Sequence, residues 1–369
     1  MRIAVLGSRG VPAAYSGIER HVEEVGARIA AVGHQVVVYC HGRGTLAEHR
    51  GMQLRYLPTL HTKHLETATH MSLAGLSVLR GFDVVHIHAV GPALFAPLPR
   101  YLSRAGVVET VHGLDSQRAK WGPTGRTVLR VGEWASARFP DVTTVVSRTL
   151  QRHYLQRYGV QTELIYNGAL APPTSTDPAA TLRKFGLEAD RYALFVGRLV
   201  PEKAPHVLIE AFRRVSGDVR LAVVGGTAHT TGYVRVLERW AADDPRIVLT
   251  GPQYGATLGD LYRHAAVFAS PSTVEGAPVT LLEAVVHGVP VIVSDIPEHL
   301  EDIDEDQPGW RVVPVTDVDA LAASLERVFA DVSAERAGIE KLSQQLLEAH
   351  DWDRAAERTL SIYERVARR

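Results

Sequence analysis

The chain has 369 residues, which suits two domains of ordinary size, and its 40 basic residues nearly balance its 41 acidic ones. A formal net charge of −1 gives no electrostatic basis for nucleic-acid binding. The single cysteine excludes a disulfide framework and a cysteine-based zinc site, and it fits a reducing compartment. No apolar run has the length of a membrane span, and no signal peptide precedes the first strand pattern, so we expect a cytoplasmic protein.

The amino-terminal elements form a strand, glycine loop, helix and strand. A short apolar run at 2–6 leads into the loop GSRGVPAAYSG, a helix is predicted from Gly17 to about residue 32, and 35–40 is the next strand. This order is typical of dinucleotide-binding units. The spacing argues against a dehydrogenase, because the third glycine of that fingerprint would fall near Pro12 and the second strand lacks the expected acid.

A histidine follows a later strand of the same alternating pattern. Strands are predicted at 52–57, 83–87 and 107–111, and the last of these ends in His112. Open α/β folds bind ligands at the carboxyl ends of their strands, so this position favours a ligand contact over the other sixteen histidines. Asp115, in the following HGLD segment, is either part of an acceptor site or a turn residue.

The stretch 117–139 is basic and contains two tryptophans. Five cations face a single acid, Glu133, and the cations and tryptophans are Arg118, Lys120, Arg126, Arg130, Arg138, Trp121 and Trp134. Two interpretations remain open. The stretch is either an interfacial, lipid-facing helix or a solvated basic helix whose tryptophans lie in the core.

The composition predicts where the domains divide. After a strand at 141–146 and the segment ELIYNGA, the run APPTSTDPAA is rich in Pro, Ser and Thr and is typical of a linker. We therefore expect a first α/β domain at 1–170, a linker at 171–189, a second α/β domain at 190–350 and a terminal amphipathic helix at 351–369.

The second domain opens with GRLVPEKAPHVLIEAF. A strand at 191–196 ends in Gly197, and Arg198 and Lys203 stand on either side of a turn before a helix near residue 204. Two cations at a strand end could neutralise a diphosphate leaving group, or they could be surface cations in a loop. Tyr254, after a later strand, either lies near a nucleotide base or packs its turn.

The stretch 270–295 carries two acids eight positions apart. Glu275 lies in a loop after a buried strand, and Glu283 lies in a helix that Pro278 opens and Gly288 closes. A helix amino terminus favours phosphate, and a carboxylate accepts two hydroxyl hydrogen bonds, as from a ribose diol. The alternative is a solvated loop acid followed by a surface helix acid.

This stretch resembles the donor-binding signature of the retaining GT-B glycosyltransferases of glycosyltransferase family four. Their pattern is Glu, Gly, a small residue, Pro and a second Glu eight positions after the first, and the chain has each element: Glu275, Gly276, Ala277, Pro278 and Glu283. The resemblance implies that the first Glu contacts the transferred sugar and that the second binds the ribose of the nucleotide.

The resemblance covers nearly the whole chain. Ser16 and Gly17 stand where the family has a glycine pair near the sugar, with serine replacing the first glycine. His112 would contact the donor sugar, and Arg198 and Lys203 beside Gly197 would bind the diphosphate. The implied fold is two Rossmann-like parallel-sheet domains facing a cleft, with an acceptor-side domain, a nucleotide-sugar-binding domain and a carboxyl-terminal helix that crosses back to the first.

The resemblance implies a metal-independent, retaining glycosyltransferase. Within the family, the sequence is most similar in its motifs to bacterial polysaccharide or rhamnosyltransferase-like members. The enzyme would move a sugar from a nucleoside diphosphate-sugar to a hydroxyl of a glycan or lipid-linked sugar, with peripheral contact at the inner face of the membrane through 117–139. No cofactor is expected. The Asp-X-Asp pairs at 302–304 and 317–319 are interpreted as an acidic surface run and a helix cap.

Three alternatives remain open on the same fold. They are a nucleotide-sugar epimerase, a phosphorylase and a non-enzymatic nucleotide-sugar sensor. Phosphate-dependent turnover would identify the phosphorylase. Donor binding without turnover would identify the sensor.

Overall fold

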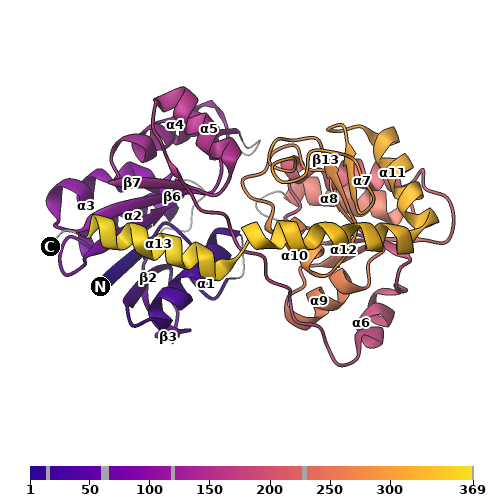
Figure 1. The fold of residues 1–369 in the computed structure, drawn as a ribbon, viewed down its shortest axis with the longest axis horizontal. Helices are drawn as coiled ribbons and strands as arrows, with labels where there is room; N and C mark the ends of the chain where they lie inside the picture. Colours follow the sequence, from indigo (N-terminus) through magenta and orange to yellow (C-terminus); the bar gives the residue numbers. More distant parts are fainter. Residues whose placement is uncertain (14–16, 60–65, 118–120, 227–230, 368–369) are drawn as a thin grey trace. The chain divides into compact units, whose positions relative to one another are not determined.

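The computed structural model describes residues 1–13, 17–59, 66–117, 121–226 and 231–367. The chain divides into two compact units (Figure 1). Unit 1 comprises Met1–Gly168 and His350–Arg369, and unit 2 comprises Ala169–Ala349. Each unit has its own sheet and its own apolar cores.

The sheet of unit 1 has the strand order β3-β4-β2-β1-β5-β6-β7-β8. Only the β3–β4 pair is antiparallel among its pairings. The central strands are short and largely buried, as expected where helices cover both faces of a parallel sheet, whereas β3, β4 and β8 toward the two edges are partly exposed. Their bounds are β1 Arg2–Leu6, β2 Gln35–His41, β3 Glu48–His49, β4 Met52–Leu57, β5 Val84–His88, β6 Gly106–Val111, β7 Val142–Val145 and β8 Glu163–Leu164.

Alternate residues of the central strands in unit 1 enter different cores. Ile3 and Val5 of β1 belong to the core beneath α1 and α13, whereas Ala4 and Leu6 belong to the core beneath α2 and α3. The helices and short 3₁₀ turns are α1 Gly17–Ala31, α2 Glu66–Ser77, η1 Pro92–Phe95, α3 Pro97–Leu102, η2 Asp115–Gln117, α4 Pro123–Arg138, α5 Arg148–Tyr158 and α13 Trp352–Val366.

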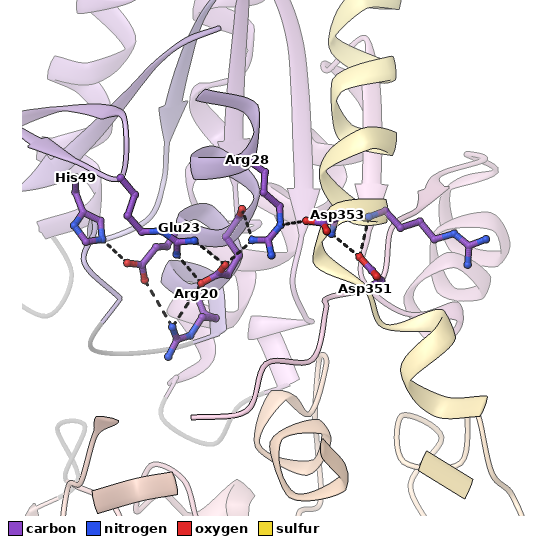
Figure 2. Close-up of polar contacts among 9 residues, drawn as sticks. Arg20, Glu23, Arg28, His49, Asp351 and Asp353 are labelled. Atoms are coloured by element: carbon purple, nitrogen blue, oxygen red, sulfur yellow. Dashed lines mark hydrogen bonds and ion pairs between the residues drawn. The ribbon is translucent and has the colours of Figure 1, made fainter. Parts of the chain in front are cut away.

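The carboxyl-terminal helix α13 packs on unit 1, as the predicted fold class requires. Asp351 caps it by accepting from the backbone N–H groups of Asp353 and Arg354. Figure 2 shows Arg28 of α1 reaching Asp353, with 2.5 Å between Nε and Oδ1. Beneath these polar contacts, Trp352, Tyr363 and other apolar residues of α13 complete the core shared with α1.

The sheet of unit 2 has the strand order β11-β10-β9-β12-β13-β14, and all its pairings are parallel. Here too the strand residues alternate between two cores. The strands are β9 Tyr192–Val196, β10 Arg220–Val224, β11 Ile247–Gly251, β12 Val267–Ser270, β13 Val291–Ser294 and β14 Trp310–Val313. The helices and the 3₁₀ turn are α6 Pro178–Phe185, η3 Pro201–Lys203, α7 Pro205–Phe212, α8 Thr231–Ala242, α9 Gly255–Arg263, α10 Val279–Val286, α11 Val318–Ala330 and α12 Val332–Ala349.

The predicted linker at 171–189 differs from the structure, because this stretch lies within unit 2 and contains α6. Polar residues of this stretch form hydrogen bonds to α9. The buried carboxylate of Asp260 on α9 accepts hydrogen bonds from the Ser175 backbone N–H at 2.8 Å, the Ser175 hydroxyl at 2.6 Å and the Thr181 hydroxyl at 2.7 Å. Composition alone indicated a linker. It could not reveal that the segment is ordered by Asp260, a buried acid 85 residues away from Ser175.

Candidate functional site

The loop after β9 brings the predicted phosphate-binding residues to the carboxyl edge of the sheet of unit 2. A β-carbon on Gly225 would lie 1.9 Å from the carbonyl oxygen of Gly197, so two strand ends meet here at backbone distance. Arg198 follows and is partly exposed. Lys203 ends the turn η3, and Ala204, with φ of 49°, reverses the chain into α7.

Lys203 and Glu275 form a direct ion pair between Nζ and Oε1. The Ser272 hydroxyl donates a second hydrogen bond to the same oxygen of Glu275 at 2.7 Å. The Glu275 side chain is only 6% exposed and that of Lys203 18%, so the interpretation of Glu275 as a solvated loop acid is wrong. The loops after β9 and β12, 72 residues apart in sequence, thus meet at one buried charge pair.

The surroundings of Glu275 favour its ionised form. Burial alone would raise the pKa of this carboxyl. The electrostatic effects of Lys203 and His299, together with the hydrogen bonds from Lys203 and Ser272, outweigh burial and hold the pKa below its usual value. Glu275 is therefore a carboxylate at neutral pH, an acceptor only. It is suited to binding hydroxyl groups.

His299 lies behind this pair, and no motif in the sequence pointed to it. Its Nδ1 lies 3.0 Å from the carbonyl oxygen of Ser294 and its Nε2 lies 3.2 Å from the Ser270 hydroxyl. Burial lowers its pKa to about 4, so the imidazole is neutral, with Nδ1 donating to the carbonyl and Nε2 accepting from Ser270. It ties together the ends of β12 and β13 beneath Glu275.

The second acid of the signature is also buried. Glu283, on α10, is 8% exposed, so its interpretation as a surface helix acid is wrong. The Tyr262 hydroxyl donates to its Oε2 at 2.9 Å and is a partner that sequence reasoning missed. Pro278 stands at the N-cap of α10 rather than inside the helix. Gly276 is buried and Ala277 is partly exposed in the turn that precedes it.

Tyr254 is the exposed member of the predicted set in unit 2. It occupies the N-cap position of α9, and 62% of it is accessible. The interpretation in which it packs its turn is therefore wrong. A stacking role with a base stays a prediction.

In unit 1, His112 joins a row of buried histidines at the strand ends. Its Nε2 lies 3.0 Å from Nδ1 of His88, and its ring meets that of His21 edge to face at 4.9 Å between centroids. His86, two residues before His88 on β5, contacts the Tyr363 hydroxyl at 2.5 Å. His21 contacts Asn167 at 2.8 Å. The pattern VVHIH of β5 was the signal for this row, because residues i and i+2 share a face of the strand.

Burial keeps these supporting histidines uncharged. It lowers the pKa of His21 to about 4 and that of His86 to about 3. It also lowers the pKa of His88 well below its ordinary value, with further lowering from the neighbouring imidazoles. A neutral imidazole has one donor and one acceptor nitrogen, so the row can hold His112 in one orientation through hydrogen bonds without net charge.

The glycine loop of unit 1 is held against α1. Ser16 lies outside the described residues, and Gly17 is the first residue of α1. Glu19 accepts from the backbone N–H of Arg9 at 3.2 Å, and Glu23 accepts from that of Ala13 at 3.1 Å. Glu19 and Glu23 of α1 therefore hold the loop in place through its backbone.

The structure brings Lys203, Glu275 and their supporting residues together in unit 2, and it brings His112 into the histidine row of unit 1. Among the described residues, no group of three His, Cys, Asp or Glu side chains is placed to hold a metal ion. Asp317 of the second Asp-X-Asp pair caps α11 through the backbone N–H of Ala320, as predicted. Asp319 of the same pair contacts Arg214.

The fold and these strand-end sites define a two-domain glycosyltransferase of the GT-B type, and the comparisons with known proteins agree. Residues 15–169 match the family described as Glycosyltransferase Family 4, and residues 190–331 match that described as Glycosyl transferases group 1. The chain therefore belongs to the glycosyltransferases of family four. This confirms the predicted family, fold class and enzyme class.

Three known proteins illustrate the likeness. An uncharacterised glycosyltransferase of Methanocaldococcus jannaschii is 24% identical over 98% of each chain. The phosphatidyl-myo-inositol mannosyltransferase of Mycolicibacterium smegmatis is 23% identical over 95% of this chain and 90% of its own. The structure of Anabaena Alr3699/HepE in complex with UDP and glucose is 18% identical, covers 99% of this chain and all of its own, and has a TM-score of 0.82.

Proposed function

We propose that the protein transfers a sugar from a nucleoside diphosphate-sugar to a hydroxyl acceptor with retention of configuration and without a metal. The observation that carries the proposal is the buried Lys203–Glu275 pair at the strand ends of unit 2. The Anabaena neighbour that was solved with UDP and glucose supports a nucleotide-sugar donor.

In this proposal Lys203 connects the two parts of the donor. Its ammonium group has three donor positions, and Glu275 occupies one of them, so the others are available to phosphate oxygens. Arg198 on the same loop adds a second positive charge. Negative charge on the diphosphate grows as the glycosidic bond lengthens, and fixed cations in a partly dry site stabilise that charge. This is why no metal is required.

The two acids bind the hydroxyl groups of the donor. Glu275, held ionised by Lys203, accepts from the transferred sugar, and Glu283, oriented by Tyr262, accepts from the ribose. His112 and the backbone at Gly17 orient the sugar from unit 1. The acceptor hydroxyl attacks from the face that the leaving phosphate vacates and passes its proton to that phosphate, so the anomeric configuration is retained.

The first test is a thermal-shift panel of UDP, GDP, dTDP, ADP and NAD⁺, with and without EDTA, on the wild type and on Lys203→Ala. A ligand that binds only the folded state raises the midpoint by mass action. We expect one nucleoside diphosphate to do so in the presence of EDTA, and Lys203→Ala to abolish the shift. A shift with NAD⁺ alone, or no shift with a folded protein, would overturn the donor site.

A turnover assay then separates the alternatives on the same fold. The matching nucleotide-sugar is incubated with a panel of hydroxyl acceptors, with and without inorganic phosphate. Release of the nucleoside diphosphate that depends on an acceptor supports the transferase. Turnover that depends on phosphate, epimerised donor without an acceptor, or donor binding without any turnover would instead identify the phosphorylase, the epimerase or the sensor.

We further propose that the acceptor is lipid-linked and that unit 1 contacts an anionic lipid surface. Arg118 and Lys120 lie outside the described residues, but the rest of the predicted stretch supports the lipid-facing interpretation. Val128, Val131 and Trp134 of α4 are each 47–49% exposed, so Trp134 is not a core residue. The mannosyltransferase of Mycolicibacterium smegmatis is named for a phosphatidyl-linked substrate.

The exposed apolar face continues beyond α4. Trp134 packs on Phe139 at 5.3 Å between ring centroids, and Phe139 packs on Tyr101, which is 68% exposed. The exposed charged residues of α4 are all arginines, at 126, 130 and 138. Aromatic rings with arginines suit the headgroup region of an anionic membrane. Among the described helices, none is long and apolar enough to cross one.

Sedimentation with vesicles tests this contact. We expect binding to phosphatidylglycerol vesicles, with weaker binding to phosphatidylcholine and a marked loss in Val131→Ser/Trp134→Ser. Val32→Ser is the matched control, because Val32 is 65% exposed at the end of α1, outside this face. Equal binding by both variants, or none by the wild type, would contradict the contact.

A further inference from the structure

A basic hollow of about 340 Å³ lies in unit 1 between α4, α5 and the turn η2. Its lining consists of Ser116, Arg126, Arg130, Glu133, His153 and Arg157. None of these residues belongs to the set predicted to bind the donor. The hollow is large enough for a phosphate group together with part of the molecule that carries it.

The hollow carries an excess of positive charge. Its one acid, Glu133, is 3% exposed and already accepts hydrogen bonds from His153 at 2.5 Å and from the Tyr158 hydroxyl at 2.9 Å. Arg126 and Arg130 are both exposed, and neither forms an ion pair within the described part of the chain. Three guanidinium groups around one space repel each other, and a bound anion would relieve that repulsion.

The lining also has the geometry of an anion site. Arg126 and Arg130 are four residues apart, so both project from one face of α4. A guanidinium presents a planar fork of N–H donors that matches the oxygens of a phosphate, and Ser116 adds a hydroxyl donor. Glu133 holds His153 through its Oε1 oxygen and is only 3% exposed, so the three arginines outnumber the single acid of the lining.

The position of the hollow connects it to the proposed reaction. Ser116 is only four residues after His112, so their α-carbons lie at most about 14 Å apart. That distance is about the length of one or two sugar rings. A phosphate held by the arginines would therefore leave the sugar or polyol that it carries within reach of the residue predicted to contact the donor sugar.

We propose that this hollow binds the phosphate of the acceptor, so that the acceptor is a phosphate-bearing sugar, polyol or lipid-linked glycan. This proposal rests on the proposed transferase function. A soluble phosphomonoester and a lipid phosphate present the same chemistry to the arginines.

The test measures binding of inorganic phosphate and of glucose 6-phosphate by titration calorimetry, using the full chain. We compare the wild type with Arg126→Gln/Arg130→Gln, with Arg138→Gln as the matched control on the same helix, and with Lys203→Ala as a donor-site variant. We expect the double variant to lose at least about tenfold in affinity, since each arginine contributes charge-assisted hydrogen bonds, and the other two to bind as the wild type does. Arg130→Lys, which keeps the charge but not the fork, should lie between.

A second arm identifies a lipid source of the phosphate. Vesicles containing phosphatidic acid, which carries a phosphomonoester, are compared with phosphatidylglycerol vesicles of equal surface charge. A larger loss of binding to phosphatidic acid than to phosphatidylglycerol in the double variant supports a lipid phosphate, even if the soluble probes bind weakly. Equal loss on both vesicles, with no effect on soluble probes, would indicate general surface electrostatics and overturn the site.

Two further results would overturn the proposal. One is phosphate binding that Lys203→Ala abolishes and the double variant leaves intact, because the phosphate then sits in the donor site. The other is no difference between the double variant and the wild type with any probe. Failure of the transferase function is read separately, from the nucleoside diphosphate panel.

Discussion

At the carboxyl ends of its strands, unit 1 has a row of buried, neutral imidazoles, whereas unit 2 has a buried ion pair. The two sites share a sheet type and a position in it, but they provide different chemistry. Neutral hydrogen-bonding groups suit a sugar, and a cation held by a carboxylate suits a phosphate next to a sugar. In the proposed function, the two similar α/β units therefore take different parts of one reaction.

Removal of the cation from unit 2 should have the largest effect. Lys203→Ala leaves Glu275 buried with Ser272 as its remaining hydrogen-bond donor among the described residues, and breaking a buried pair in this way costs about 3–5 kcal/mol of unfolding free energy. It also removes a charge that stabilises the leaving phosphate, which should lower kcat/KM about 100-fold or more. Urea unfolding and steady-state kinetics measure the two effects.

A paired variant separates stability from catalysis. Lys203→Met/Glu275→Gln removes both charges, so the unfolding free energy should largely recover while kcat/KM stays low. Recovery of activity in this double variant would show that the pair is structural only. The ion pair would then give unit 2 no chemical role that differs from that of unit 1.

Acidification should destabilise the histidine row of unit 1. His21 and His86 have pKa values of about 4 and 3 in the folded chain, against about 6.5 in the unfolded chain, so the unfolded state binds more protons between these values. Stability is therefore fully present above pH 6.5 and falls as the pH is lowered, by about 1.4 kcal/mol per pH unit for each such histidine.

Chemical unfolding between pH 7 and 5 measures this slope. Burial raises the pKa of the Glu109 carboxyl well above its usual value, so this group contributes with the opposite sign, and a variant of the row is needed to isolate the histidines. Replacing one member of the row, as in His21→Gln, should reduce the slope by about one proton's contribution. A slope that His21→Gln leaves unchanged would contradict the neutral row. His21→Gln also serves as the comparison for any loss of folding that is independent of pH.

Truncation of His112, the histidine predicted to contact the donor sugar, should have a moderate effect on activity. His112→Ala removes a hydrogen-bonding group, which is worth about 0.5–1.5 kcal/mol, so kcat/KM should fall about two- to tenfold. His112→Gln keeps a donor and should recover part of the rate. Equal activity in His112→Ala and the wild type would remove unit 1 from the proposed sugar site.

Loss of the partner of Glu283 should have a smaller effect. Tyr262→Phe deletes the hydroxyl that donates to Glu283 and keeps the ring that packs in the core. The carboxylate loses one fixed contact of about 1 kcal/mol, so nucleoside diphosphate affinity should weaken about fivefold. Calorimetry with the nucleotide found in the panel measures this. An unchanged affinity would separate Tyr262 from the ribose site.

The smallest effect should come from the surface contact between α1 and α13. Asp353 is 77% exposed where it meets Arg28, so Asp353→Ala should cost less than about 1 kcal/mol. Trp352→Ala, which opens the core under the same helix, should cost several times more, about 3–5 kcal/mol. A larger effect for Asp353 than for Trp352 would mean that charge, not burial, holds α13 in place.

The repeating α/β pattern was well predicted because it depends on local sequence. The strand at 52–57 has its predicted bounds, and the strand predicted at 83–87 is displaced by a single residue. Glu275 and Glu283 could be selected as site residues because their spacing belongs to a motif. Short apolar runs bounded by glycine are thus sufficient to locate strands of a parallel sheet.

The supporting residues could not be predicted in the same way. His299 and Tyr262 contact the signature acids only because other strands and helices bring them there, and no local pattern marks them. The linker prediction for 171–189 was wrong for the same reason, because the order of this segment depends on Asp260 on another helix. Sequence reveals which residues carry charge, but the fold decides which of them lose their water.

The return of α13 to unit 1 also sets an order of events during synthesis. Trp352, Ile362 and Tyr363 belong to a core whose other members lie in the first half of the chain, such as Val22 and Val25 of α1. Unit 2 has all its residues once Ala349 has been made. During synthesis, unit 2 can therefore close first, while unit 1 keeps an open apolar groove until α13 has been made. Until then, the apolar residues of α1 that α13 covers in the folded chain stay exposed to water.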